Sequence, residues 1–156
     1  MFIAEKIIDQ VVEKLESADF EKEIETMGKQ QPALMSFVFS EDFDLLTQSE
    51  RDLMLYMLLV ICQSVGEAKG ISIPPLPTKS IEAAEEHNWE LLENSKSQKF
   101  RDRMTVFFED TEQEDLLAFV EDTLTEDDED STYNVTKEGR EPLFVALKSV
   151  IDVICA

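Results

Sequence analysis

The sequence predicts an all-α fold: a compact single-domain bundle of about six to seven helices around a central apolar helix over residues 48–65. Apolar residues recur at intervals of three and four along almost the whole chain, and strand-like alternation is scarce. Thr47 and Glu50 have the spacing of a helix capping box. The chain has 156 residues, which is enough to bury a core but short for two ordinary domains, so residues 1–156 are taken as one domain.

The first expected helix carries one apolar stripe, with most of its charged residues on the other side. This stripe comprises Ile3, Ile7, Ile8, Val11, Val12 and Leu15. A second helical segment begins near Asp19, breaks around Gly28 and resumes after Pro32, because proline suits the first turn of a helix. A dense apolar patch follows between Leu34 and Phe39.

The central helix is apolar on nearly every side, from Leu53 to Cys62. Such a helix must be covered on most sides, either by its own fold or by a second subunit. The stretch that follows, residues 66–78, is rich in glycine and proline and is expected to be an extended connection. Its helix-breaking residues are Gly66, Gly70, Pro74, Pro75 and Pro77.

Further helices are expected at about 79–95 and 97–109. Another is expected after Thr111, which forms a second capping-box spacing with Glu114. An acidic loop is expected at about 125–137. The last helix is predicted to start with Pro142 in its first turn, and its apolar side comprises Leu143, Leu147, Val150, Ile151 and Ile154.

The chain is strongly acidic, with 35 Asp and Glu residues against 14 Lys and Arg, a net charge of −21 and a pI near 4.2. This charge disfavours nucleic acid and anionic membrane as ligands. The sequence has no signal-peptide pattern and no apolar run long enough to span a bilayer. Cys62 and Cys155 form no disulfide framework, so a cytoplasmic location is predicted.

The densest charge lies between Glu109 and Asp130, where twelve acidic residues occur without a base. One interpretation is a solvated loop and helix flank. The other is a docking surface for a basic partner, because clustered charge steers oppositely charged proteins. Trp89 either packs in the core or anchors an interface. The candidate partner-binding residues are Glu126, Asp127, Asp128, Glu129, Asp130 and Trp89.

No metal, cofactor or catalytic site is predicted. A calcium loop from Asp127 to Glu138 would have Thr132 where the sharp turn needs glycine. His87 and Glu90 could supply two metal ligands, but the chain has no second histidine for a zinc site. The basic residues Lys96, Lys99, Arg101 and Arg103 are expected to neutralise neighbouring acids. Neither cysteine resembles an activated thiolate.

The favoured function is a non-enzymatic module that binds another protein, either a basic partner or a second copy of the chain. A first alternative is an inhibitor, immunity-type or nucleic-acid-mimic protein that blocks a basic partner. A second is a carboxylate-based metal-binding or enzymatic bundle, with His87 and Glu90 or Asp127 and Glu138 as ligands. A third is a homodimer whose central helix packs across a two-fold axis.

Overall fold

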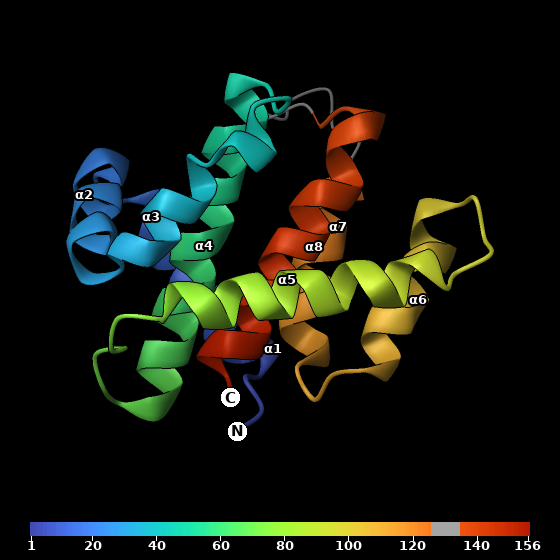
Figure 1. Ribbon diagram of the computed structural model, residues 1–156. Helices are drawn as coiled ribbons and strands as arrows, with labels where there is room; N and C mark the ends of the chain where they lie inside the picture. Colours follow the sequence, from blue (N-terminus) through green and yellow to red (C-terminus); the bar gives the residue numbers. More distant parts are fainter. Residues whose placement is uncertain (126–134) are drawn as a thin grey trace.

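The computed structural model describes residues 1–125 and 135–156, and this part of the chain contains eight α-helices, one 3-10 helix and no strand (Figure 1). The all-α prediction is confirmed. None of the helices in these ranges has the length and apolar character needed to cross a membrane. The elements are α1 (Glu5–Glu16), α2 (Phe20–Gln30), α3 (Pro32–Val38), η1 (Glu41–Phe43), α4 (Gln48–Lys69), α5 (Thr78–Glu93), α6 (Phe100–Glu109), α7 (Glu114–Thr125) and α8 (Lys137–Ile154).

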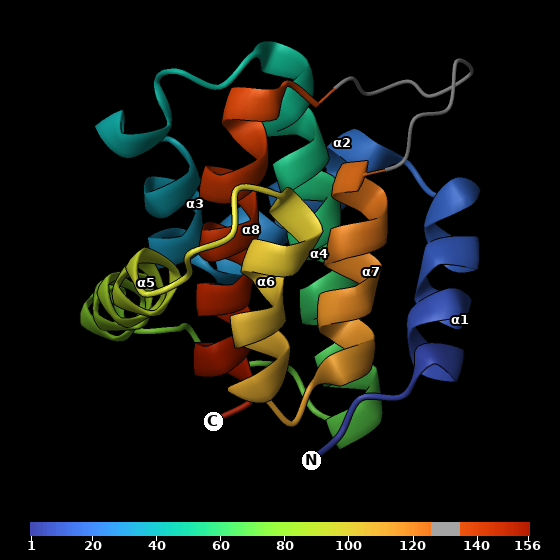
Figure 2. The same cartoon turned by 90° about the vertical axis from the view of Figure 1, so that its right-hand side faces the viewer.

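The bundle is built around α4 and α8. In Figure 2 the helices α1, α4, α6, α7 and α8 stand upright together, whereas α5 is seen nearly end-on. Figure 1 shows α5 from the side, crossing in front of the upright helices. Helix α8 contacts α4, α5, α6 and α7, and α1 packs on both α4 and α7. The two chain ends lie at the same end of the bundle in both views.

Helix α4 is the central apolar helix that the sequence predicts. Between Leu53 and Ile61 every residue except Tyr56 is buried. Helices α1, α2, α3 and α8 of the same chain contact it. Other helices of the same chain therefore cover α4. An uncovered central helix was the reason to expect a homodimer through α4, and that reason no longer applies.

The start of α4 follows the predicted capping box. The backbone N–H of Glu50 donates to Thr47 Oγ1 at 3.1 Å, and the N–H of Thr47 donates to Glu50 Oε1 at 2.9 Å. The helix runs past Gly66 to Lys69 and ends at Gly70, whose φ of 66° is the left-handed conformation that glycine adopts at low cost. The extended connection therefore begins at Gly70 instead of Gly66.

The predicted break at Gly28 is wrong, because Gly28 lies inside α2. A glycine within a helix costs only about 1 kcal/mol relative to alanine, which favourable packing can offset. Here the side chain of Met35 from α3 packs against Gly28. The chain breaks instead at Gln31, and Pro32 opens α3 as expected.

Two predicted helix starts in the second half of the chain are also wrong. Thr111 does not cap α7: its hydroxyl accepts from the N–H of Gln113, and the helix begins at Glu114. Helix α8 begins at Lys137, well before Pro142, because the Thr136 hydroxyl accepts from the backbone N–H of Gly139 at 3.0 Å. Pro142 then lies inside α8, and because proline has no N–H, the carbonyl of Glu138 lacks its intrahelical donor. Glu138 is exposed, so water can donate to this carbonyl instead.

Candidate functional site

An acidic recess lies between α3, η1 and α5. It has a volume of about 190 Å³, and its lining includes the carboxylates of Asp42, Glu82 and Glu85. Burial raises the pKa of the Glu85 carboxyl above its ordinary value, and the charges of Asp42 and Glu82 raise it further. We call these three carboxylates the acidic face. Their mutual repulsion is a cost that a cation seated among them would reduce.

Two exposed apolar side chains lie three residues from Asp42 in the chain, one on each side. Phe43 is only 2% exposed and anchors η1 to the core, with its ring in an edge contact with Phe37. Phe39 and Leu45, which lie just outside η1, remain 56% and 98% exposed. Arg51 lies over the Phe39 ring at 5.4 Å, and its Nη2 donates to the carbonyl of Phe43 at 2.9 Å. The segment around η1 therefore presents apolar and acidic groups together.

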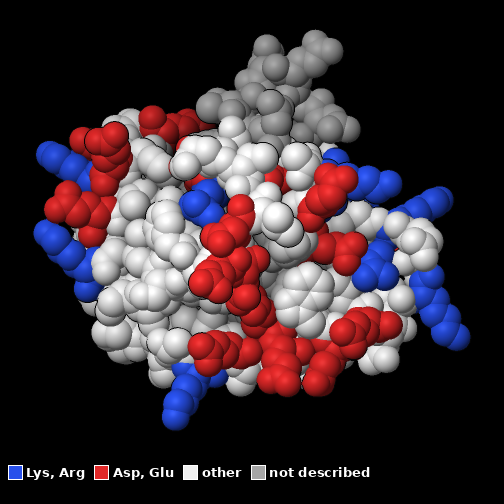
Figure 3. Space-filling model, turned by 45° about the horizontal axis from the view of Figure 1, so that its top comes forward, with Lys and Arg blue, Asp and Glu red and all other residues white. Residues whose placement is uncertain are grey.

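Figure 3 shows how charge is distributed on one side of the molecule. Asp and Glu side chains gather in a band through the middle of this side, and most of the Lys and Arg side chains stand near its margins. A basic surface approaching this side meets the acidic groups first. The charge of the chain is therefore organised on this side and not mixed evenly with bases.

A second polar site is buried between α5, α6 and α8. The Lys148 side chain is fully buried, and its Nζ donates to both carboxylate oxygens of Asp152 at 2.7 and 2.8 Å. Asp110 Oδ2 and Asn88 Oδ1 lie 3.4 and 3.5 Å from the same nitrogen. Asn88 Nδ2 donates to Asp152 Oδ2 and to Ser149 Oγ, both at 3.0 Å. We call this group the Lys148 cluster.

The Lys148 cluster joins three helices through one buried ammonium. Its polar atoms are used within the cluster, and Ser149 Oγ also donates to the Val145 carbonyl at 2.6 Å. The cluster was not predicted from the sequence. The sequence does contain a signal for it, namely a charged residue on an apolar helix stripe. Lys148 stands four residues after Phe144 and three before Ile151, and Asp152 follows one helical turn later. The cluster fixes how α5 and α6 pack on α8.

The structure leaves most of the predicted partner-binding residues untested. The acidic run Glu126, Asp127, Asp128, Glu129 and Asp130 lies outside the described residues. Trp89 lies on α5, partly buried and packed against the core cluster. Its role as an interface anchor stays a prediction. The acidic face, which sequence reasoning did not single out, comes from two segments about forty residues apart in the chain.

The two metal hypotheses gain no support from the described residues. His87 is 55% exposed, and the carboxylate near its Nε2 is that of Asp110, at 3.5 Å, which comes from the end of α6. Glu138 is exposed in the first turn of α8, whereas Asp127 lies outside the described ranges. Among residues 1–125 and 135–156, no group of three or more His, Cys, Asp or Glu residues could hold a metal ion.

Two of the four basic residues expected to neutralise acids, Arg101 and Arg103, are paired with acids, whereas Lys96 and Lys99 form no ion pair with a described residue. Arg101 contacts Glu121 at 2.9 Å and Asp122 at 3.8 Å, and Arg103 contacts Glu141 at 3.0 Å. Burial raises the pKa of Cys62 to about 12 and that of Cys155 to about 11. Both thiols are therefore protonated at neutral pH, which does not suit a nucleophile.

Comparisons with known proteins add no family. Protein-family models, curated proteins and solved structures all gave no match to this chain. The functional argument therefore depends on the chain's own chemistry.

Proposed function

We propose that this chain is a non-enzymatic protein-interaction module that binds a basic partner segment through the acidic face. The observation that carries this proposal is the recess in which Asp42, Glu82 and Glu85 lie close enough for two of the charges to raise the pKa of the third. A Lys or Arg side chain from a partner relieves this repulsion. The gain is larger than at an isolated surface charge, because Glu85 is partly desolvated before binding.

The exposed side chains of Phe39 and Leu45 define the rest of the partner segment. Large exposed apolar residues next to a charged recess are typical of the centre of a protein interface, which is apolar with a polar rim. The segment that fits carries basic residues for the acidic face and apolar residues for Phe39 and Leu45. An amphipathic basic helix has this composition.

An inhibitor, immunity-type or nucleic-acid-mimic protein is a special case of this proposal. The band of acidic side chains in Figure 3 is the observation that favours it, because a mimic must present a run of neighbouring acidic groups. In that case the partner is a nuclease or another DNA-binding protein, and DNA competes with this chain for it.

The experiment is affinity capture of partners at low and high salt, with three forms of the protein as bait. The face variant is Asp42→Asn, Glu82→Gln, Glu85→Gln. The control variant makes the same charge change at exposed positions on α1 and α2, Glu13→Gln, Glu16→Gln, Glu21→Gln. A basic protein held at low salt by the wild type and the control, but not by the face variant, is the expected result.

Equal loss of the partner from both variants would show that only the total charge matters and would contradict the assignment of the face. Capture that is insensitive to salt would also contradict it. The partner that passes this test is then titrated against Phe39→Ser, Leu45→Ser in a calorimeter. Weakened binding with an unchanged salt dependence is expected, because the substitution removes apolar contact and leaves charge intact.

A further inference from the structure

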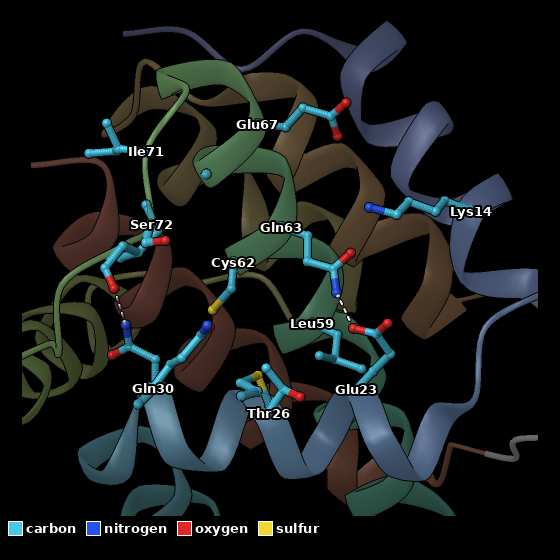
Figure 4. Close-up of a pocket in the computed structure, with 14 residues that line it drawn as sticks. Lys14, Glu23, Thr26, Gln30, Leu59, Cys62, Gln63, Glu67, Ile71 and Ser72 are labelled. Carbon is cyan, nitrogen blue, oxygen red and sulfur yellow. Dashed lines mark hydrogen bonds between the residues drawn. The ribbon is translucent and has the colours of Figure 1, made fainter.

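A pocket of about 320 Å³ lies between α1, α2, α4 and residues 71–73 of the connection (Figure 4). It shares no residue with the acidic face. Its floor is apolar and largely buried, with Met27 only 4% and Leu59 only 2% exposed. Cys62 completes this floor and is neutral at physiological pH, since burial raises the pKa of its thiol to about 12.

One wall of the pocket is fixed by hydrogen bonds. The Gln31 side chain is almost fully buried, and its Nε2 donates to the carbonyls of Ile73 at 3.1 Å and Pro74 at 2.9 Å. Its Oε1 accepts from the N–H of Leu76 at 2.8 Å. These three bonds tie the connection to the end of α2. The pocket is therefore preformed, and a ligand does not have to order this wall.

Hydrogen-bond acceptors gather at the other end of the pocket. Gln63 Nε2 donates to Glu23 Oε2 at 2.9 Å, which fixes the amide and leaves Gln63 Oε1 free to accept. Glu67 stands one helical turn further along α4 and also lines the pocket. Two carboxylates and an amide oxygen thus border an apolar floor. This combination suits a ligand with a cationic head and an apolar stem.

Lys14 shows that a cation can be placed here. Its side chain extends from α1 toward Gln63 in Figure 4. It is exposed, and no ion pair or side-chain hydrogen bond to a described residue holds it in place. An incoming ammonium group can therefore reach the acceptors without breaking an ion pair or a hydrogen bond of Lys14.

We propose that this pocket binds a small organic ammonium ion with a short aliphatic stem. The ammonium group is accepted by Glu23, Glu67 and Gln63 Oε1, and the stem lies on Met27, Leu59 and Cys62. Anions are rejected by the two carboxylates and by the net charge of −21. A neutral alcohol of the same length fits the floor but loses the charge-assisted hydrogen bonds.

The test is a titration of the protein with n-butylamine and 1,4-diaminobutane, with butyrate and n-butanol as matched controls of charge. Binding is followed by NMR through the side-chain amide of Gln63, which reports on the site directly. Saturable shifts with the amines and none with butyrate are expected. Glu67→Gln and Glu23→Gln should each weaken amine binding by about tenfold or more, because each removes one charged acceptor.

Two variants make the result specific. Lys14→Met removes the competing cation and should strengthen amine binding. Glu25→Gln removes one negative charge from the exposed surface of α2, outside the pocket, and should leave binding unchanged. The proposal is overturned if the amines cause no shift at Gln63, or if butyrate or butanol binds as tightly as the amines. It is also overturned if Glu25→Gln weakens amine binding as much as Glu67→Gln does. Failure here leaves the acidic face untouched, because the two sites have separate variants and probes.

Discussion

A methyl group added at Gly139 tests the buried contacts of the Glu50 carboxylate. Glu50 is 1% exposed, and its carboxylate serves the starts of two helices. Oε1 accepts from the N–H of Thr47, and Oε2 accepts from the N–H and the hydroxyl of Thr136 at 3.0 and 2.9 Å. A Cβ at Gly139 would overlap Glu50 Oε2 and would stand 2.7 Å from its carboxyl carbon. The carboxylate must move, and moving it breaks or lengthens the bonds from Thr136.

The expected cost of Gly139→Ala follows from those bonds. Losing the two bonds from Thr136 costs roughly 1.5–3 kcal/mol each, since the acceptor is charged. The better helix propensity of alanine stabilises the fold by about 1 kcal/mol and offsets part of this loss. The net loss of unfolding free energy is about 2–5 kcal/mol. At this chain length a loss near 3 kcal/mol lowers Tm by roughly 6–12 °C.

The assay is urea unfolding followed by circular dichroism, with two comparisons. Gly28→Ala is the matched control, because a Cβ there would meet Met35 Cγ at an ordinary 3.4 Å, and it should stabilise the protein by up to about 1 kcal/mol. In a Glu50→Ala background the carboxylate is gone and Thr136 Oγ1 remains at 3.1 Å, so Gly139→Ala should cost less than in the wild type by about 1 kcal/mol or more. The reasoning is refuted if Gly139→Ala is neutral alone, or equally costly in both backgrounds.

Three further predictions concern buried charge. Lys148→Met leaves the Asp152 carboxylate without its ammonium partner. Because Asp152 is 27% exposed, the unfolding free energy should fall by about 2–3 kcal/mol, which is less than the full cost of breaking a buried pair. Adding Asp152→Asn should restore part of this loss in the same urea assay. Glu85→Gln should raise the unfolding free energy at pH 7 by up to about 0.5 kcal/mol, because the raised pKa of Glu85 means that its ionised carboxylate is unfavourable in the folded state. This gain should vanish below pH 4.5, the ordinary pKa of the group, where the carboxyl is protonated in both states. A gain that persists there would contradict this cause. The rate at which the thiols react with Ellman's reagent should still increase with pH between about pH 9 and 10. Cys62, whose pKa is about 12, should react more slowly than Cys155, whose pKa is about 11. A rate that levels off near pH 9 would contradict both raised pKa values.

Local chemistry in the sequence predicted much of the fold. Helix periodicity predicted the all-α class, and the capping box of Thr47 and Glu50 marked the start of α4. Where predictions were wrong, tertiary contacts decided the outcome. Gly28 stays helical because Met35 packs on it, and α8 begins before Pro142 because Thr136 caps it. Glycine and proline are weak signals when packing or a nearby cap opposes them.

The candidate sites were harder to predict, because they join segments far apart in the chain. The acidic run near Asp128 was conspicuous in the sequence, yet the acidic face comes from η1 and α5. Its residues are ordinary surface acids until the fold brings Asp42 beside Glu85. Lys148 could have been found as a charge on an apolar stripe. Its partners Asn88 and Asp110 could not, since nothing local connects those three positions.

The double role of Glu50 also has a consequence for the order in which the chain becomes protected from solvent exchange. Both helix caps are local contacts, but Thr136, which caps α8, also donates its N–H and its hydroxyl to Glu50 Oε2, 86 residues earlier. The contact between Thr136 and Glu50 therefore forms only when α8 docks on α4, and the entropy of closing the loop between them opposes it. Amides at the start of α8 should exchange in the same opening event as those of α4, so that the two helices behave as one cooperative unit although 67 residues lie between them.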